Sequence, residues 1–420
     1  MNAAGVTGST PVDRRNFLLN AGEGAIYAAS TALINPQTVL PALVYELGGS
    51  SVLVGLLTIL VSLGLYLPQL FAARYIETLP WKKPWAVGFG ALHRFLALVI
   101  AIVILLFGRT SPSSALWLFF LFFTAMQLTI GVSTPGWFDM FAKMTPARAR
   151  GRLFGIRTSV GGAGAFLCSL AMTWLLSSFG FPTSYALLFL VAFVMQVVSL
   201  VMQMGLKELE PSATGTRRDF AAFLRELPAE LRANPPFRNF LIACSLLTVA
   251  TMPVGFYTVY ALKTFRASGA VVGEFTSTMV AVQVVSALVN GYIADRYGSK
   301  RALLVASGGL LGASLVALAA PTLGYFRLVY PLLGINLGTE MMMKYNMSIG
   351  FGPARKRSTY VGMMNTVLAP LYLCGLAGGV ISELWGFPVV FLIGVGFSIC
   401  GIVFLLFRVS EPLAQEAGRA

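Results

Sequence analysis

The chain has 420 residues, of which 57% are hydrophobic and only 11% are charged. A water-soluble domain carries about 25% charged residues, so this composition excludes a soluble globular surface and favours a lipid environment. The formal net charge of +14 raises the question of a nucleic-acid partner, which depends on where the basic residues lie.

Long apolar segments follow one another along the whole chain. Segments of about 20 residues or more cross the hydrocarbon as helices, whereas barrel strands would alternate over about ten residues. The first six segments cover roughly 17–45, 51–76, 85–107, 114–142, 153–179 and 183–205. The second six cover roughly 239–264, 270–293, 301–320, 323–350, 359–382 and 387–408. We therefore predict an all-α membrane protein with twelve transmembrane helices.

Lysine and arginine concentrate in alternate loops between these segments. The clusters lie at 14–15, 82–83, 143–152, 207–238, 296–301 and 355–357. Cytoplasmic loops carry such an excess of basic residues, so we expect both termini in the cytoplasm and the chain in the cytoplasmic membrane. This distribution explains the net charge without nucleic acid.

The two halves of the chain repeat each other. Arg15-Asn-Phe-Leu recurs as Arg238-Asn-Phe-Leu, at the start of each half. We expect an N-terminal six-helix bundle over 1–205, a central polar segment over 206–236 and a C-terminal six-helix bundle over 237–420. The central segment has apolar residues at helical spacing among arginines, which suits a helix on the cytoplasmic headgroups or, equally, a flexible tether. A parallel repeat of this kind places a binding site between the halves, near the middle of the membrane.

One loop carries a distinctive motif between the eighth and ninth segments. The chain reads Gly291-Tyr-Ile-Ala-Asp295-Arg296-Tyr-Gly298-Ser-Lys300-Arg301. Gly291 would let helices approach closely, Gly298 would permit a tight turn, and the basic residues would anchor the loop in the cytoplasm. Asp295 would accept hydrogen bonds at a helix end or pair with a cation.

This motif resembles the loop signature of the major facilitator superfamily, Gly-x-x-x-Asp-Arg-x-Gly-x-(Lys/Arg)-(Lys/Arg). The equivalent first-half loop is degraded, with Glu77 in place of Asp295 and Pro80 in place of Gly298. The resemblance implies a secondary transporter in which two six-helix bundles rock around a central cavity lined mainly by spans 1, 4, 7 and 10. The motif loops would then be gate elements.

Ionisable residues inside the segments are the candidates for coupling and substrate binding, because a charge in the membrane is costly and is functional by default. Glu23 in the first span is a candidate proton carrier or a member of a permanent ion pair. Glu340 and Lys344 lie at i and i+4 in the tenth span, as an intrahelical pair or a functional one. Arg94 in the third span favours a structural partner over a substrate anion, and its neighbour His93 favours a satisfied interfacial position over a proton relay.

Two further sets of residues are gate candidates. Asp139 closes the fourth span, and we expect it to contact Arg150 or Arg157. Glu274 and Arg327 lie near the outer ends of their spans, as a latch or as solvated rim residues. Pro36, Pro41 and Pro253 fall in spans 1 and 7 and predict kinks there.

Three functions remain open on the sequence. The first is proton-coupled efflux of a lipophilic or cationic small molecule, and the second is proton-coupled uptake of a nutrient or organic anion. The third is a non-transporting assembly or sensor protein. We expect a monomer in the lipid bilayer with a small-molecule substrate and protons as coupling ions. No nucleotide-binding loop, metal cluster or catalytic constellation is present in the sequence, so we expect no enzyme activity, no cofactor and no metal.

Overall fold

A computed structural model describes residues 11–76, 78–145, 147–209, 211, 220–352 and 357–412. Glu77 of the degraded loop and residues 212–219 of the central segment lie outside these ranges. Every regular element within them is a helix. Eleven of these helices are long and apolar enough to cross a membrane. The remaining predicted span, 323–350, is divided into three shorter helices between Leu323 and Phe351.

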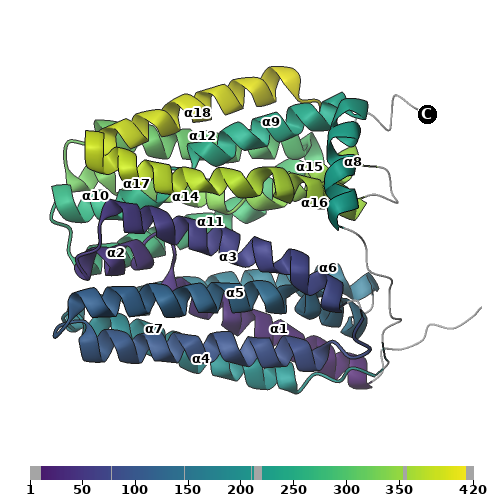
Figure 1. The fold of residues 1–420 in the computed structure, drawn as a ribbon, viewed down its shortest axis with the longest axis horizontal. Helices are drawn as coiled ribbons and strands as arrows, with labels where there is room; N and C mark the ends of the chain where they lie inside the picture. The colour runs from purple at the N-terminus through teal and green to yellow at the C-terminus, as the bar shows by residue number, and fades with distance from the viewer. Residues whose placement is uncertain are drawn as a thin grey trace, which may run out of the picture.

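The first half contains the helices that form the lower body in Figure 1. They are α1 (Pro11–Thr31), η1 (Ala32–Ile34), α2 (Val39–Glu46), α3 (Ser51–Ile76), α4 (Lys83–Phe107), α5 (Pro112–Met144), α6 (Ala147–Ser178) and α7 (Thr183–Met204).

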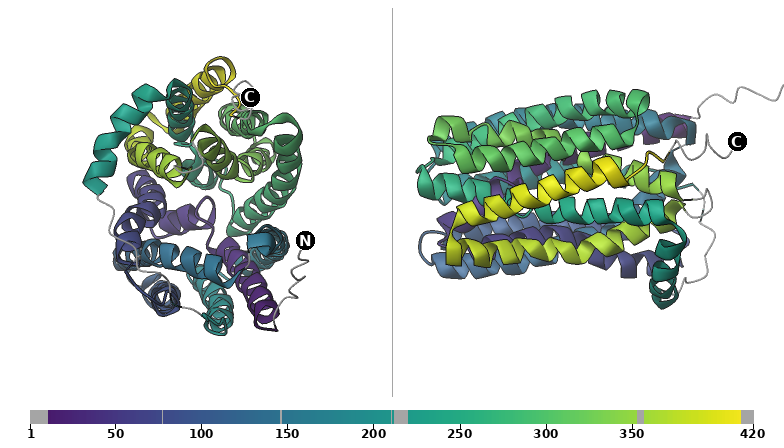
Figure 2. Two further views of the ribbon diagram at one scale, coloured as in Figure 1. Left: turned by 90° about the vertical axis from the view of Figure 1, so that its right-hand side faces the viewer. Right: turned by 90° about the horizontal axis from the view of Figure 1, so that it is seen from above.

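The second half forms the upper body, and α8 (Phe220–Ala233) precedes it. Its helices are α9 (Pro235–Ala250), η2 (Val254–Phe256), α10 (Tyr257–Thr264), α11 (Gly269–Tyr297), α12 (Ser299–Ala319), α13 (Leu323–Phe326), α14 (Val329–Leu337), α15 (Glu340–Phe351), α16 (Arg357–Leu368), η4 (Ala369–Leu373), α17 (Cys374–Trp385) and α18 (Phe387–Arg408). The end-on view in Figure 2 shows the two bundles side by side. We call the end that carries α8 the α8 end, and the opposite end, which carries α2 and α10, the α2 end.

Several spans are broken in the middle. The first span breaks after Asn35, whose backbone is extended (ψ 125°), and proline follows at once. The Asn35 side chain accepts hydrogen bonds from the backbone N–H groups of Gln37 and Thr38, at 2.9 and 3.2 Å, and so satisfies groups that the break leaves open. The seventh span is interrupted between α9 and η2, around Pro253. The predicted breaks at Pro36 and Pro253 are confirmed, whereas Pro41 lies inside the first turn of α2.

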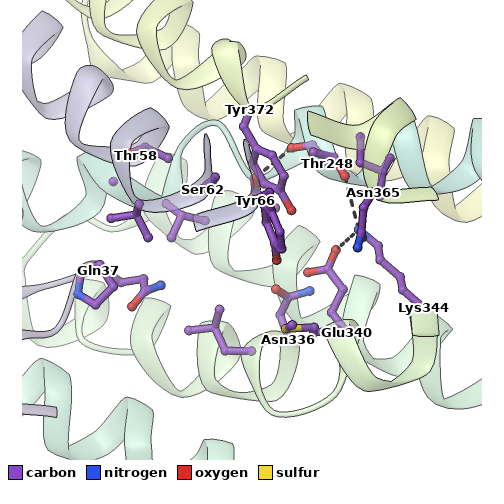
Figure 3. A pocket seen from close by; sticks show the side chains of 18 of the residues that line it. Gln37, Thr58, Ser62, Tyr66, Thr248, Asn336, Glu340, Lys344, Asn365 and Tyr372 are labelled. Carbon is purple, nitrogen blue, oxygen red and sulfur yellow. Dashed lines mark hydrogen bonds and ion pairs between the residues drawn. The ribbon is translucent and has the colours of Figure 1, made fainter. Parts of the chain in front are cut away.

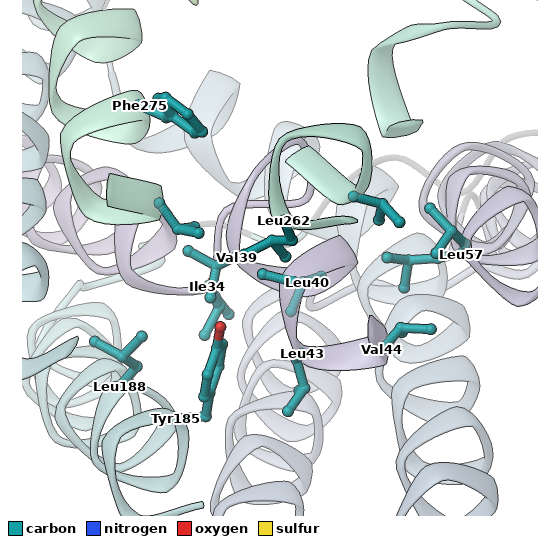
Figure 4. Packing of buried hydrophobic residues seen from close by; sticks show 14 of the residues in the cluster. Ile34, Val39, Leu40, Leu43, Val44, Leu57, Tyr185, Leu188, Leu262 and Phe275 are labelled. Atoms are coloured by element: carbon teal, nitrogen blue, oxygen red, sulfur yellow. The ribbon is translucent and has the colours of Figure 1, made fainter. Parts of the chain in front are cut away.

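The two halves share one hydrophobic core at the α2 end. Figure 4 shows first-half residues such as Ile34 and Val39 in the same cluster as Leu262 of α10 and Phe275 of α11. Towards the α8 end the buried residues divide into separate clusters, one around Phe237 in the second half and one around Met140 in the first. The halves are therefore joined by apolar packing at one end and packed independently at the other.

Polar and backbone contacts between the halves also lie at the α2 end. The hydroxyl groups of Thr38 and Thr276 are 2.6 Å apart, and Thr258 donates to the carbonyl oxygen of Gln37 at 3.2 Å. Helices α3 and α17 approach so closely that a Cβ atom at Gly55 would lie 2.3 Å from the carbonyl oxygen of Gly375. Since only glycine permits this approach, α3 and α17 hold the halves together at this end.

The α8 end has a matched cap in each half. Glu208, beyond α7, accepts hydrogen bonds from the backbone N–H groups of Lys82 and Lys83, where α4 begins. Glu411, beyond α18, accepts the corresponding bonds from Ser299 and Lys300, where α12 begins, both at 2.9 Å. A carboxylate at the first turn satisfies open N–H groups and interacts favourably with the helix dipole.

Lysine side chains add the reverse contact in each cap, because they donate from the start of one helix to the carbonyl groups at the end of the other. Lys83 Nζ donates to the carbonyl oxygens of Met204 and Leu206 at the end of α7, each at 2.7 Å. Lys300 Nζ donates to Leu406 at the end of α18, at 2.9 Å. The Lys300 position of the loop motif therefore ties two helices together within its own half.

Helix α8 packs on the second half through residues in its range 227–231. Leu227 and Leu231 contact the second-half cluster around Phe237. Glu230 accepts a hydrogen bond from the hydroxyl group of Tyr360 at 2.9 Å. The predicted central helix thus exists over 220–233, and these residues attach it to the second half.

The Glu208 cap predicts a pH-dependent loss of stability. Burial alone raises the pKa of the Glu208 carboxyl. Hydrogen bonds from Lys143, Lys83 and Lys82 lower the pKa by more than burial raises it, so the pKa lies below its ordinary value. A lowered pKa stabilises the fold above the ordinary value, and this contribution is lost as the pH falls through the folded-state pKa. We expect Glu208→Gln to lower the free energy of unfolding by about 1 kcal/mol at pH 7, and by progressively less below about pH 4.

The measurement is the thermal unfolding midpoint of purified protein between pH 7 and pH 3. Glu411→Gln, at the matched cap, should show a loss at pH 7 of the same sign. A gap between Glu208→Gln and the unmodified protein that stays constant through acid would contradict the role of this carboxylate.

Candidate functional site

A central cavity of about 230 Å³ lies between the two halves. Its first-half wall includes Gln37, Thr58, Ser62 and Tyr66. Its second-half wall includes Thr248, Asn336, Glu340, Lys344, Asn365 and Tyr372. Figure 3 shows these side chains facing a common space. The breaks in the first, seventh and tenth spans all border this cavity, so it lies where the backbone departs from helix.

Glu340 and Lys344 form an ion pair on the cavity wall. The Glu340 Oε1 to Lys344 Nζ distance is 2.5 Å, and the ammonium also lies 3.3 Å from the hydroxyl group of Thr248. Lys344 is buried, and the Glu340 side chain is 14% exposed. Glu340 is the first residue of α15, so the positive end of the helix dipole also stabilises its charge. The structure gives the predicted intrahelical pair and adds its position on the cavity.

The break in the tenth span positions this pair. Helix α14 ends at Leu337, and α15 begins at Glu340, after Gly338 and Thr339. Asn290 of α11 donates to the Thr339 hydroxyl at 2.9 Å and holds the break in place. Sequence reasoning missed this break because no proline marks it. Gly338 was its only signal.

Two tyrosines, one from each half, stack at the cavity. The rings of Tyr66 on α3 and Tyr372 in η4 have centroids 6.3 Å apart and an interplanar angle of 22°. Figure 3 shows both rings above Glu340 and Asn336. A stacked pair across the halves presents apolar faces and two hydroxyl groups to the same space. Neither tyrosine was a sequence candidate.

A second cavity, of about 240 Å³, lies inside the first half. We call it the first-half cavity. Glu23 on α1 lines it and is 3% exposed. The Glu23 carboxylate lies 2.7 Å from Arg157 Nη1 on α6 and 3.9 Å from Arg94 Nη2 on α4. The structure thus brings together Glu23 and Arg94, which the sequence offered as separate candidates.

Arg94 holds α4 against α7. Its Nε donates to the carbonyl oxygen of Gln196 at 2.8 Å, and its Nη2 donates to the hydroxyl group of Ser199 at 3.1 Å. Its Nη1 donates to Gly90 within α4 at 2.7 Å. Each nitrogen of this guanidinium therefore has a protein partner, as the expected structural role requires.

Arg157 lies between a glycine and an indole ring. A Cβ atom at Gly24 would be 1.9 Å from Arg157 Cζ, so a side chain there would displace the guanidinium. The guanidinium carbon of Arg157 lies 4.8 Å from the centroid of the Trp137 ring, within the range of a cation–π contact. Asn20 accepts hydrogen bonds from Arg157 Nη1 through its side-chain oxygen and through its backbone carbonyl. These contacts fix the orientation of the guanidinium.

His93 is buried beside this network. Its ring packs edge-on against Tyr27, with centroids 5.9 Å apart. The backbone of Phe89, one turn earlier on α4, can pair with one ring nitrogen, and no side chain among the residues that the structure describes pairs with either. One ring nitrogen is therefore left without a partner, so His93 is only partly satisfied.

A small cavity of about 160 Å³ lies between the two larger ones. It shares Pro36 and Val61 with the central cavity, and Tyr27, His93 and Ile130 with the first-half cavity. The three cavities therefore form a series from Glu340 to Glu23.

The expected contact of Asp139 with Arg150 or Arg157 differs from the structure. Asp139 is half-exposed and lies 4.0 Å from Lys82 Nζ. Arg150 folds back onto the end of α5 and donates to the carbonyl oxygens of Ala142 and Thr145. Carbonyl groups at a helix end lack intrahelical partners and attract a cation. Arg157 lies deeper along α6, where it forms an ion pair with Glu23.

The loop motif has one confirmed glycine and one that the structure corrects. Gly298 has φ +95° and forms the turn between α11 and α12, as expected. A Cβ atom at Gly291 would meet nothing within 4 Å, so the expected close helix approach is absent there. Asp295 is exposed, Arg296 donates to the hydroxyl group of Tyr292 at 3.0 Å, and Arg301 lies over the ring of Tyr297.

Glu274 and Arg327 pair with each other at the rim of the second half. Glu274 and Arg327 form an ion pair of 3.0 Å at the α2 end, with both side chains about half exposed. Both belong to the second half, so the pair does not connect the halves. Among the described residues, no group of histidine, cysteine, aspartate and glutamate has the arrangement of a metal site.

The Glu23–Arg157 pair predicts a non-additive effect on stability. Arg157→Gln leaves the Glu23 carboxylate buried beside a guanidinium that is 3.9 Å away and already engaged. We expect a loss of about 3 kcal/mol in the free energy of unfolding, because the buried carboxylate loses its 2.7 Å partner and keeps only the longer contact with Arg94. The double variant Glu23→Gln/Arg157→Gln should unfold at a higher temperature than Arg157→Gln alone. Strictly additive losses would contradict a direct coupling between the two charges.

Comparisons with known proteins agree with the fold. The sequence profile of the Major Facilitator Superfamily matches residues 24–369 and, in a second overlapping match, residues 250–419. A sequence search of curated proteins found no match.

Several transporters are among the solved structures similar to this chain. A mutant of the nucleoside transporter NupG is 13% identical with a TM-score of 0.69, covering 95% of this chain and 100% of that one. A D-xylose–proton symporter is 13% identical with a TM-score of 0.68, covering 96% and 99%. A bacterial homologue of the iron transporter ferroportin, in an inward-facing state, is 13% identical with a TM-score of 0.68, covering 96% and 100%. At such identities the structural likeness shows the fold alone, whereas the profile match spans most of the chain. The protein belongs to the Major Facilitator Superfamily.

Proposed function

We propose that this secondary transporter exports a small organic solute across the cytoplasmic membrane by alternating access, in exchange for protons. The observation that carries the proposal is the Glu340–Lys344 ion pair on a cavity between two halves that are joined at one end only. Membership of a superfamily of transporters supports the general activity. The coupling ion and the direction are our inference.

The packing of the two ends supports alternating access. The shared apolar core and the Thr38–Thr276 contact close the α2 end, while separate clusters pack the α8 end. The basic loops lie at the α8 end, which we assign to the cytoplasm. From this assignment we infer an inward-facing state, the state in which the ferroportin homologue with a similar fold is described.

Glu340 is the better placed of the two proton candidates. Its carboxylate lines the central cavity, and protonation would break the ion pair with Lys344 in the space that the solute enters. Glu23 lines the first-half cavity and is held by Arg157. A proton at Glu340 and a solute in the central cavity would therefore exclude each other directly, as exchange requires.

The wall of the central cavity favours solutes with substantial apolar surface. Val61, Val254, Leu337 and Leu368 line it together with the stacked tyrosines. Ligand sites of this kind bind through apolar area and take their orientation from a few polar groups. Solutes that also partition into membranes are ones that a cell expels, which favours export over accumulation.

Uptake of an organic anion is the second candidate. Lys344 on the central cavity and the two arginines of the first-half cavity give a basis for binding a negative charge. The direction of proton-driven movement separates this function from export.

A transport assay tests the proton coupling. Compounds that raise the melting temperature of the purified protein, among drugs, sugars and organic acids, identify a solute to follow, because a ligand of the native state stabilises it. In proteoliposomes with an imposed pH gradient, we expect that solute to move against the proton flux. Glu340→Gln should slow this movement at least about tenfold, since the carboxylate that exchanges the proton is gone.

The matched control is Glu274→Gln, which makes the same change at the half-exposed rim and should leave the rate unchanged. If Glu23→Gln loses proton coupling while Glu340→Gln keeps it, the proton site lies in the first-half cavity. Movement in the same direction as the protons would favour uptake, and no movement at all would favour a non-transporting protein.

A cross-link across the α2 end tests alternating access. The hydroxyl oxygens of Thr38 and Thr276 are 2.6 Å apart, so cysteines at both positions should form a disulfide in a background without the four native cysteines. We expect the oxidised protein to lose transport, because the α2 end can no longer open, and a reductant to restore it. The single variant Thr38→Cys should stay active in oxidant. Undiminished transport in the cross-linked protein would exclude opening at this end.

A further inference from the structure

The first-half cavity has features of a ligand site that the proposed transport cycle does not use. It is separate from the central cavity, measures about 240 Å³ and is lined by Glu23, Tyr27, His93, Arg94, Arg157 and Gln203. We propose that it binds a small organic monocarboxylate, held by the Nε–Nη2 edge of Arg157.

The charges inside this cavity favour an anion. Two guanidinium groups, of Arg94 and Arg157, face one carboxylate, of Glu23, and with His93 as a neutral imidazole the other lining residues carry no charge. One positive charge is therefore uncompensated in a buried space, which is unfavourable without an ionic partner. Water satisfies hydrogen bonds but supplies no net charge, whereas one monovalent anion balances the site.

One edge of the Arg157 guanidinium is free to bind a ligand. The hydrogen bonds of Arg157 to Asn20 and Glu23 all use Nη1, and no residue that the structure describes accepts a hydrogen bond from Nε or Nη2. An arginine edge with two parallel N–H groups matches the two oxygens of a carboxylate. Since Gly24 and Trp137 already fix the guanidinium plane, binding at this edge requires little ordering of the protein.

Unpartnered polar atoms also line this cavity. His93 is 5% exposed and Gln203 is 2% exposed. The backbone of Phe89 can pair with one ring nitrogen of His93, which leaves the other ring nitrogen and the Oε1 atom of Gln203 without partners among the described residues. A neutral imidazole offers one donor and one acceptor, and the amide oxygen needs a donor. A carboxylate that also carries a hydroxyl group can satisfy both side chains.

The polar groups of the cavity set the class of ligand. A carboxylate would meet the Arg157 edge, and a hydroxyl group on the same molecule would reach the polar atoms of His93 and Gln203. A small hydroxy acid carries both groups, and lactate is a suitable probe. Lactamide has the same shape without the charge.

The test is binding of these probes to the purified full chain, so it does not depend on transport. We expect sodium lactate to raise the melting temperature in a saturable way, and lactamide or sodium chloride at the same concentration to have no such effect. Equal protection by lactamide would overturn the role of charge. Equal protection by chloride would overturn the carboxylate assignment. Absence of any lactate effect in the unmodified protein would overturn the proposal without recourse to a variant.

A variant then locates the site. Arg157→Lys keeps the charge but removes the two-pronged edge, and we expect lactate affinity to fall about tenfold or more. Arg327→Lys makes the same substitution at the rim ion pair and should keep the affinity within about twofold. Unchanged lactate affinity in a natively eluting Arg157→Lys variant would place the carboxylate elsewhere.

Discussion

A bilayer offers no hydrogen bonds to the protein backbone, and this constraint determines where the chain can depart from helix. The breaks after Asn35, around Pro253 and at Gly338 leave backbone groups without helical partners. Each break borders the central cavity, and side chains such as Asn35 and Asn290 supply hydrogen bonds at it. The cavity and the breaks thus depend on each other, because irregular backbone at this depth is tolerated only beside protein or water. Short helices on either side of a break also give each span a place to bend when the halves move.

The same constraint applies to charged side chains. Glu23, Arg94 and Arg157 are satisfied inside one half, and Glu340 and Lys344 are satisfied on the surface between the halves. At the α8 end, Glu208 and Glu411 each close a helix terminus with the same geometry. These caps make each half a unit that can rotate without breaking its own loops. Contacts between the halves lie elsewhere, in the apolar core at the α2 end, where separation costs few hydrogen bonds.

Much of this architecture is predictable from the amino-acid sequence, because segment length and basic loops follow directly from the thickness and polarity of the bilayer. The ion pair of Glu340 and Lys344 is predictable as well, since it is local, at i and i+4. Contacts between distant helices are not. Arg157 meets Glu23 rather than Asp139 because α1 and α6 pack together, which no local pattern reveals. The glutamates at 208 and 411 looked like ordinary polar residues beyond their spans, and only their shared position after the last span of each half could have marked them.

The repeat also shows how the two halves acquired different chemistry on one backbone plan. The offset that pairs Asp139 with Asn346 pairs Ser133 with Glu340, Trp137 with Lys344 and Arg157 with Met364. Ser133, Trp137 and Arg157 line the first-half cavity, and their partners in the second half line the central cavity. In the first half the charges lie on the first, third and fifth spans, and in the second half they lie on the tenth. Equivalent positions therefore line a cavity in each half, but the charges lie on different spans, and only the second-half charges face the space between the halves. A cluster enclosed in one bundle keeps its neighbours when the bundles rock, which suits it for a ligand held within one half. A cluster on the shared surface changes its surroundings in every cycle, which suits it for exchange of a proton.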